Sequence, residues 1–179
     1  MKKVIVLAIV ALAVSCTAAF AFPVQFVDTY NPSDIRMSNG GSISFTHDIL
    51  DNGFNPLTDT LTDAELTLNF REDATSIFDG DIWSGSESVS ITLDGTNMGS
   101  RNLDLWLFNA NEQVNVGVNV AWLQTDGNLN VSLTATNGDF YFADSTLVAN
   151  GDRAAVPEPG TMMLLGMGAL GLVGLKRRS

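Results

Sequence analysis

The sequence contains very few of the residues from which catalytic and metal centres are usually built. Among its 179 residues there is one cysteine, Cys16, and one histidine, His47. No disulfide can form within the chain, and a zinc site of His and Cys ligands needs more of these residues than are present. A Ser-His-Asp triad would have to use His47, and no Gly-x-Ser-x-Gly sequence is present to hold its nucleophile. These absences predict a protein without catalytic residues, in which His47 is a structural, hydrogen-bonded side chain.

Positive charge is also scarce in the body of the chain. Residues 22–156 contain four basic and nineteen acidic residues, so this region carries 4 − 19 = −15. Such a charge repels nucleic acid and anionic lipid headgroups, which predicts no nucleic-acid partner. Soluble cations, or neutral and cationic polymers, are better matched to it.

The first 21 residues have the pattern of a signal peptide. Lys2-Lys3 is a positive start, and Val4 to Val14 is an unbroken apolar run. Ala19 and Ala21 are the small residues that signal peptidase needs, so we expect cleavage after Ala21. An alternative treats Cys16 as the acylated cysteine of a lipoprotein.

The last residues form a second apolar segment. A Pro-Glu-Pro-Gly turn at 157–160 precedes an apolar run from Thr161 to Leu175 and the basic Lys176-Arg177-Arg178. The fifteen-residue run spans only ~23 Å as a helix, which is short for a permanent anchor in a ~30 Å hydrocarbon layer. The basic residues at both ends predict that the body is translocated while the ends stay inside.

The order and spacing of this tail resemble the PEP-CTERM sorting signal of Gram-negative bacteria. The motif residues are Pro157, Glu158, Pro159 and Gly160. The resemblance implies an exosortase-type transpeptidase as a partner, transit through the inner membrane, and delivery to the cell surface or its exopolysaccharide matrix. Residues 156–179 are therefore assigned to sorting. An ordinary C-terminal membrane anchor is the alternative.

Apolar and polar residues alternate through most of residues 22–149, as expected for half-buried strands. Seven runs show this period, with apolar positions 43–49, 64–70, 89–93, 103–107, 114–122, 129–135 and 140–142. Asp126-Gly127 and Asn137-Gly138 favour two-residue hairpins, which predicts a meander of strands 114–124, 128–136 and 139–149. The predicted fold is an antiparallel β-sandwich, jelly-roll or Ig-like, between an N-terminal signal helix and a short C-terminal transmembrane helix, with a linker at 150–155.

Part of this region also resembles a sandwich domain found in PEP-CTERM exported proteins. The matching residues are His47 to Pro56, Asp59, Ala64 to Leu68, Gly138 to Phe142, and Ser145 to Leu147. This resemblance covers most of residues 42–149 and implies a fold and an export route, not an activity.

Clusters of carboxylates in the predicted loops suggest a structural Ca²⁺ site, because Ca²⁺ takes six to eight oxygen ligands. Solvated turn residues give the same pattern, since Asp favours turns. The candidate ligands are Asp48, Asp51, Asp59, Glu72, Asp73, Asp79 and Asp81.

Aromatic residues beside carboxylates suggest sugar binding. Trp83 lies in an acidic loop, and Trp106 is out of phase with the neighbouring leucines, whereas Trp122 shares the phase of a buried face. The sequence thus favours an exported protein with a structural or adhesive role in the matrix or on the surface. A module that binds exopolysaccharide is the alternative, and a small two-carboxylate hydrolase is the third.

Overall fold

The computed structural model describes residues 21–72, 87–103, 105, 111–154, 166 and 168. Residues Pro23–Arg153 form one compact unit. The strands of this unit are β1 Phe22–Tyr30, β2 Ile35–Ser38, β3 Ser42–Asp48, β4 Asp59–Glu72, β5 Glu87–Leu93, β6 Thr96–Leu103, β7 Asn111–Gly117, β8 Asn128–Asn137 and β9 Asp139–Arg153, with a short helix α2 at Val120–Asp126.

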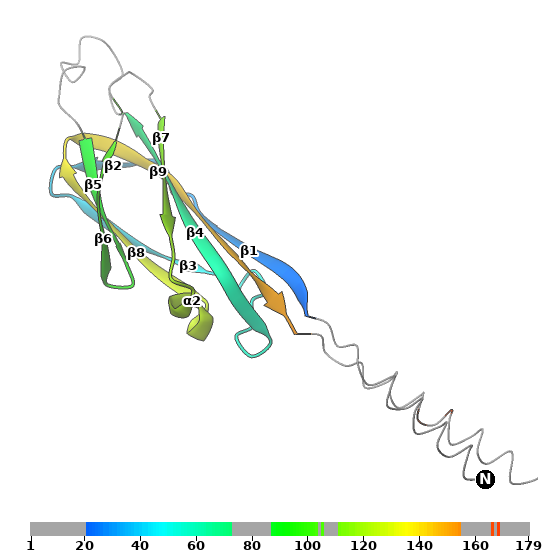
Figure 1. Ribbon diagram of the computed structural model, residues 1–179. Coiled ribbons are helices and arrows are strands. Elements are labelled where there is room, and N and C mark those ends of the chain that lie inside the picture. The colour runs from blue at the N-terminus through cyan, green and yellow to red at the C-terminus, as the bar shows by residue number, and fades with distance from the viewer. Residues whose placement is uncertain are drawn as a thin grey trace, which may run out of the picture. The chain divides into compact units, whose positions relative to one another are not determined.

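The strands form two sheets that face each other (Figure 1). Sheet A has the order β1-β9-β4-β7, with β2 also paired to β9, and sheet B has the order β3-β8-β5-β6. Four antiparallel pairs are nested one outside the other: β5 with β6, β4 with β7, β3 with β8, and β2 with β9. The innermost pair turns at Asp94-Gly95, where both φ angles are positive (44° and 76°), as a primed two-residue hairpin requires. The predicted antiparallel β-sandwich is confirmed, and this nested order is that of a jelly roll rather than an Ig domain.

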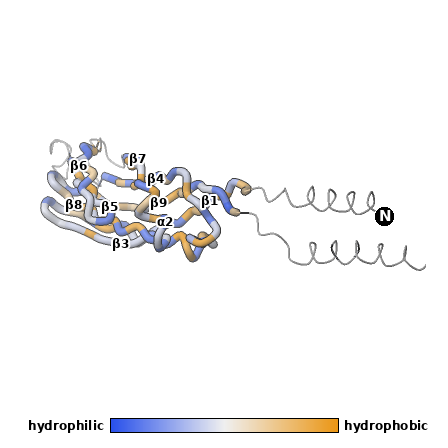
Figure 2. Tube along the Cα trace, turned by 60° about the horizontal axis from the view of Figure 1, so that its bottom comes forward, coloured by the Kyte–Doolittle hydropathy of each residue, from blue (hydrophilic) through white to orange (hydrophobic). Residues whose placement is uncertain are grey.

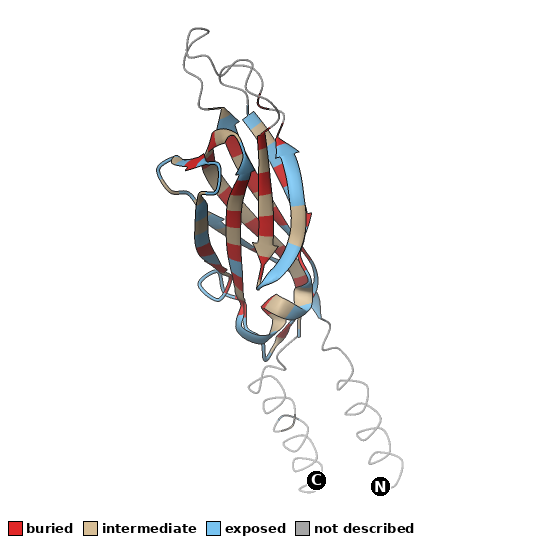
Figure 3. Cartoon of the chain, turned by 90° about the vertical axis from the view of Figure 1, so that its left-hand side faces the viewer, coloured by how far each residue is buried: buried red, intermediate tan, exposed pale blue. Residues whose placement is uncertain are grey.

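The core lies between the sheets and follows the alternation in the sequence. In sheet B the buried positions include Ile91, Leu133 and Val131, each at most 1% exposed. In sheet A they include Leu66 and Phe142, each 0% exposed. Figure 3 shows the resulting bands of buried and more exposed residues along each strand, and Figure 2 shows the matching change in hydropathy. Each strand therefore has one face in the core and one toward solvent.

The predicted meander of the last strands is wrong. β7 and β9 belong to sheet A, whereas β8 lies between β3 and β5 in sheet B. The Asn137-Gly138 turn thus carries the chain from one sheet to the other instead of closing a hairpin. Its glycine has φ 74°, a conformation that such a crossover needs as much as a hairpin does.

The predicted strand 114–124 ends early, and a helix follows it. β7 ends at Gly117, and α2 begins after Asn119, whose side chain accepts a hydrogen bond from the Ala121 backbone amide. Gly127 ends the helix in the left-handed conformation, so Asp126-Gly127 is a helix end rather than a hairpin. Trp122 is half-buried on this helix and packs against the core.

Two predicted boundaries also change. β9 continues to Arg153, paired with Asp59 of β4, so the predicted linker at 150–155 begins inside a strand. Of the predicted run at 103–107, Leu103 ends β6 and Leu105 is buried outside a strand, and the other three residues lie outside the described ones. The predicted signal helix and the apolar tail lie outside the described residues, except for Ala21, Gly166 and Gly168. Among the residues that the structure describes, no helix has both the length and the apolar character to cross a membrane.

Candidate functional site

The solvent-facing side of sheet B is almost free of charged side chains. Because alternate residues of β3, β5 and β8 are buried, the remaining positions form one outer face, which we call the sheet-B face. Its members are Ser, Thr and Asn apart from Asp48: Ser42, Ser44, Thr46, Asp48, Ser88, Ser90, Thr92, Asn97, Ser100, Asn102, Asn128, Asn130, Ser132, Thr134 and Thr136. On the edge strand β6 only Leu103 is buried, and the pairing with β5 places Asn97, Ser100 and Asn102 on this face and the exposed Arg101 on the opposite side.

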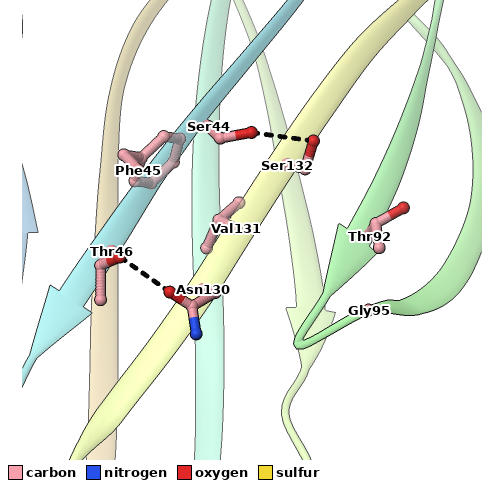
Figure 4. A pocket seen from close by; sticks show the side chains of 8 residues that line it. All are labelled: Ser44, Phe45, Thr46, Thr92, Gly95, Asn130, Val131 and Ser132. Atoms are coloured by element: carbon pink, nitrogen blue, oxygen red, sulfur yellow. Dashed lines mark hydrogen bonds between the residues drawn. The ribbon is translucent and has the colours of Figure 1, made fainter.

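A shallow depression of about 290 Å³ lies in this face. It is lined by residues of β3, β5 and β8 and by Gly95 of the β5–β6 turn (Figure 4). Phe45 and Val131 also line it, although they are only 9% and 1% exposed. The other side chains around it are Ser, Thr and Asn, so carbon atoms as well as hydroxyl and amide groups form its accessible surface.

Hydrogen bonds between strands hold the polar side chains of this face. Ser44 Oγ donates to Ser132 Oγ at 3.1 Å, and Thr46 Oγ1 donates to Asn130 Oδ1 at 2.9 Å (Figure 4). Farther along, the hydroxyls of Ser88 and Thr136 are 2.7 Å apart. A hydroxyl has one donor and two acceptor positions, so each keeps capacity for a further partner. The face can therefore offer donors and acceptors in fixed positions, without a charge.

Among the described residues, the carboxylates beside this face lie at its margins, including Asp126, whose Oδ1 accepts a hydrogen bond from the Asn128 backbone amide at 3.1 Å. Asp48 is the last residue of β3. Asp94 is in the β5–β6 turn, where its Oδ1 accepts hydrogen bonds from the backbone and side-chain amides of Asn130 (2.9 and 3.0 Å). The centre of the face, around Ser132 and Thr92, is uncharged.

A second polar cluster is buried between the sheets. His47 of β3 is 0% exposed, with its Nδ1 at 2.8 Å from Asp28 Oδ2 and its Nε2 at 2.7 Å from Ser145 Oγ. A carboxylate can only accept, so Nδ1–H donates to Asp28, and Ser145 donates its hydroxyl proton to Nε2. Burial lowers the pKa of His47 below its usual 6.5, and the Asp28 carboxylate opposes this only in part. The imidazole is therefore neutral and links sheet B to two strands of sheet A.

This cluster has the connectivity of a Ser-His-Asp triad but not the access that catalysis needs. Ser145 is 0% exposed, so no substrate carbonyl can reach its Oγ. None of the three residues lines the depression of the sheet-B face. The predicted structural role of His47 agrees with these hydrogen bonds.

One candidate calcium ligand, Asp59, is engaged in an ion pair. Both of its oxygens lie 2.7 Å from nitrogens of Arg153, which also donates to the Gly53 carbonyl at 2.6 Å. The Arg153 guanidinium holds the pKa of Asp59 below its usual range, and the Asn55 backbone amide adds to this. These contacts join the start of β4 to the end of β9.

The other predicted ligands are dispersed or not described. Asp48 and Asp51 lie in and after β3, whereas Glu72 ends β4. Asp73, Asp79, Asp81, Trp83 and Trp106 lie outside the described residues. Among the described side chains, no three His, Cys, Asp or Glu residues are grouped as metal ligands would be. The calcium site stays a prediction.

The sequence analysis missed the sheet-B face. Its signal is the identity of the polar residues in the alternating runs: Ser and Thr in 88–92, and Asn, Ser and Thr in 128–136. In the 63–71 run the polar positions instead include Asp63, Glu65 and Arg71. Comparing polar residues between runs would have separated the two faces.

The fold is similar to domains of larger solved structures. They include a β-porphyranase of glycoside hydrolase family 86 from Bacteroides plebeius (17% identity, 79% of this chain, 23% of that chain, TM-score 0.48) and dimeric latent PorU from Porphyromonas gingivalis (12%, 76%, 14% and 0.46). A family 35 carbohydrate binding module from Clostridium thermocellum also matches (15%, 71%, 98% and 0.39). The chain spans less than a quarter of the length of the first two. Because all three TM-scores are below 0.5, the sandwich is defined here by its own strand order. A search of curated proteins found no match.

The tail gives a direct family match. Residues 155–178 match the PEP-CTERM protein-sorting motif, which begins directly after the last described residue of the body, Ala154. They include Pro157, Glu158 and Pro159 and the basic end of the chain. The chain therefore carries a PEP-CTERM sorting signal behind its β-sandwich, which indicates an exported protein that an exosortase sorts to the cell surface.

Proposed function

We propose that this protein is a non-enzymatic component of the cell surface or extracellular matrix, with a structural or adhesive role. The observation that carries the proposal is the sorting motif at residues 155–178 behind a folded acidic domain. The burial of the sole histidine supports a role without catalysis, because His47 is committed to Asp28 and Ser145. Signal peptidase removes residues 1–21, and an exosortase-type transpeptidase processes the tail after transit through the inner membrane of a Gram-negative bacterium.

The residue types of the motif suit recognition by a protease. Pro157 and Pro159 fix φ near −65°, and each disfavours a helical residue before it. In the sequence, Glu158 stands between these two prolines, after the folded body and before the apolar run. Only residues 154–157 separate Glu158 from Arg153, the end of β9.

Cleavage of the two ends of the chain in cells tests this proposal. In cells that produce an exosortase, we expect mature protein lacking both ends, measured by intact mass. Replacing Pro157, Glu158 and Pro159 by Ala should leave the apolar tail attached and the protein in the inner-membrane fraction. Asp152→Ala is a matched control, because it removes a nearby exposed acid outside the motif. Normal release of the triple variant would contradict the role of the motif.

A second candidate function is carbohydrate binding. The uncharged hydroxyl and amide groups of the sheet-B face favour it, because sugars present the same chemistry. Trp83 and Trp106 remain proposed stacking residues. Trp83→Ala and Trp106→Ala should each weaken binding to a polysaccharide if that side chain stacks on a sugar ring.

A further inference from the structure

We propose that the sheet-B face binds an uncharged, hydroxyl-rich polysaccharide along β8. This inference rests on the second candidate function and assigns it a place and a ligand class. β8 is the strand between β3 and β5, so its outward side chains lie in the interior of the face. The ten residues of β8 extend about 34 Å, and the four strands cover about 14 Å across. This area can hold several sugar rings of one extended chain.

The charge distribution selects the ligand. The region 22–156 has a charge of −15, but among the described residues the carboxylates beside the sheet-B face, at Asp48, Asp94 and Asp126, lie at its margins. An anionic polysaccharide would be repelled by the rest of the domain. A cationic polymer would instead be drawn to the outer side of sheet A, which carries Asp63, Glu65 and Asp144. A neutral polymer is neither repelled by the acidic domain nor drawn to the outer side of sheet A.

The hydrogen bonds of the face prepare it for such a ligand. Ser44, Ser132, Thr46 and Asn130 are already paired across β3 and β8, so less side-chain freedom is lost on binding. Their remaining donors and acceptors match sugar hydroxyls, which are also both donors and acceptors. A second copy of this chain is a poorer occupant, because the centre of a homodimer interface is usually apolar.

The face has no aromatic side chain among its outward positions, so recognition depends on hydrogen bonds and contact area. Each such bond contributes little when it replaces one with water. We therefore expect weak binding by a single domain, strengthened when many copies on a surface contact one polymer.

The test uses the full-length protein in a detergent without sugar headgroups and electrophoresis through gels containing a polysaccharide. The probes are dextran, galactomannan and mixed-linkage β-glucan as neutral polymers, and alginate as an anionic one. The variants are Ser132→Lys and Ser132→Glu on β8. The matched controls are Thr146→Lys and Thr146→Glu, which place the same groups on the outer side of β9 in sheet A.

We expect at least one neutral polymer to retard the wild type and alginate not to. Both Ser132 variants should lose about tenfold in affinity, because a charge at this position must be desolvated and blocks the face. The Thr146 variants should bind within about twofold of wild type, since surface changes elsewhere leave the fold intact. Thermal melts of all variants would confirm that each one is folded.

Three results would overturn the inference. If Ser132 variants bind neutral polymers as wild type does, carbohydrate binding stands but lies elsewhere. If no neutral polymer retards the wild type, or if alginate binds and Ser132→Lys strengthens it, the ligand class is wrong, while the exported structural role is unaffected. If the wild type self-associates in sedimentation and Ser132→Lys abolishes this, the face is an interface between copies.

Discussion

The two sheets bury similar inner faces but present different outer faces. Sheet A carries charged side chains outward and pairs several of them: Arg36 with Asp139 at 2.5 Å, and Arg71 with Asp34. Arg71 also lies 6.0 Å from the centre of the Tyr141 ring. Apart from Asp48, the outward positions of sheet B carry hydroxyls and amides, several of them joined by neutral hydrogen bonds. A half-buried strand requires only a polar outer residue, so the fold does not explain why one face is charged and the other is not.

The difference between the two outer faces shows that the residues that stabilise the fold are not the ones that determine the surface chemistry. Burial of apolar side chains stabilises both sheets in the same way. Neutral outer residues and exposed ion pairs contribute little to stability. The composition of the outer faces is therefore free to follow interactions outside the molecule, and sheet B is the face on which charge is missing.

The largest expected losses of stability come from substitutions on the buried faces, and they test whether sheets A and B contribute equally to the core. Phe142→Ala in sheet A should lower the free energy of unfolding by about 3–5 kcal/mol, because a fully buried ring is lost and a cavity remains. Leu133→Ala in sheet B should lower it by about 2–5 kcal/mol for the same reason. Urea unfolding measures both. A cost below about 1 kcal/mol for either would show that its sheet contributes little to the core.

A smaller loss is expected at the ion pair that joins the ends of β4 and β9. Asp59→Ala removes the charged acceptor of Arg153 and of the Asn55 amide, which should destabilise the fold by about 2–3 kcal/mol. Asp152→Ala is the control, because this exposed acid lies in the same strand pair and its loss should cost less than about 0.5 kcal/mol. Equal melting temperatures for the two variants would contradict the assigned role of Asp59.

The sequence predicted the faces of the strands better than their order. Alternation identified the inward residues because each strand lies between core and solvent, and Leu66, Leu68 and Phe70 are all buried as expected. Alternation does not specify which sheet a strand joins. The turn residues do not specify the connection either. Gly127 and Gly138 both have positive φ, but Gly127 ends a helix and Gly138 lies in a crossover between the sheets.

The missed helix and the buried cluster have similar explanations. Helix α2 has seven residues and one buried side chain, Leu123, so it is too short to show a helical stripe. The sequence predicted a hydrogen-bonded His47 but could not name its partners. Asp28 and Ser145 are 19 and 98 residues away, and only the packing of the two sheets brings them together.

The contact between the two sheets at His47 should make the stability of the fold depend on pH, because His47 of sheet B is hydrogen-bonded to Asp28 and Ser145 of sheet A. Its folded pKa is lowered by burial, so the unfolded chain binds the proton more readily. The part of the free energy of unfolding that depends on neutral His47 should be fully present above pH 6.5, the pKa of histidine in the unfolded chain. It should be lost as the pH falls below 6.5.

Melting temperatures of wild type and His47→Gln between pH 5 and 8 would measure this effect. The amide cannot titrate, so the variant should lack the part of the slope that His47 contributes, although it is less stable at neutral pH. Parallel curves for the two proteins would show that His47 does not titrate differently on folding.

The smallest effects should distinguish the two outer faces. Arg71→Gln on sheet A breaks an exposed ion pair with Asp34 and should cost less than about 1 kcal/mol, and added salt should shrink this cost. Ser132→Ala on sheet B should cost less than about 1 kcal/mol, with no dependence on salt, because it removes a neutral hydrogen bond. Urea unfolding at low and high NaCl measures both. A salt-dependent cost at Ser132 would mean that charge reaches the centre of the sheet-B face, and the argument for a neutral ligand would lose its basis.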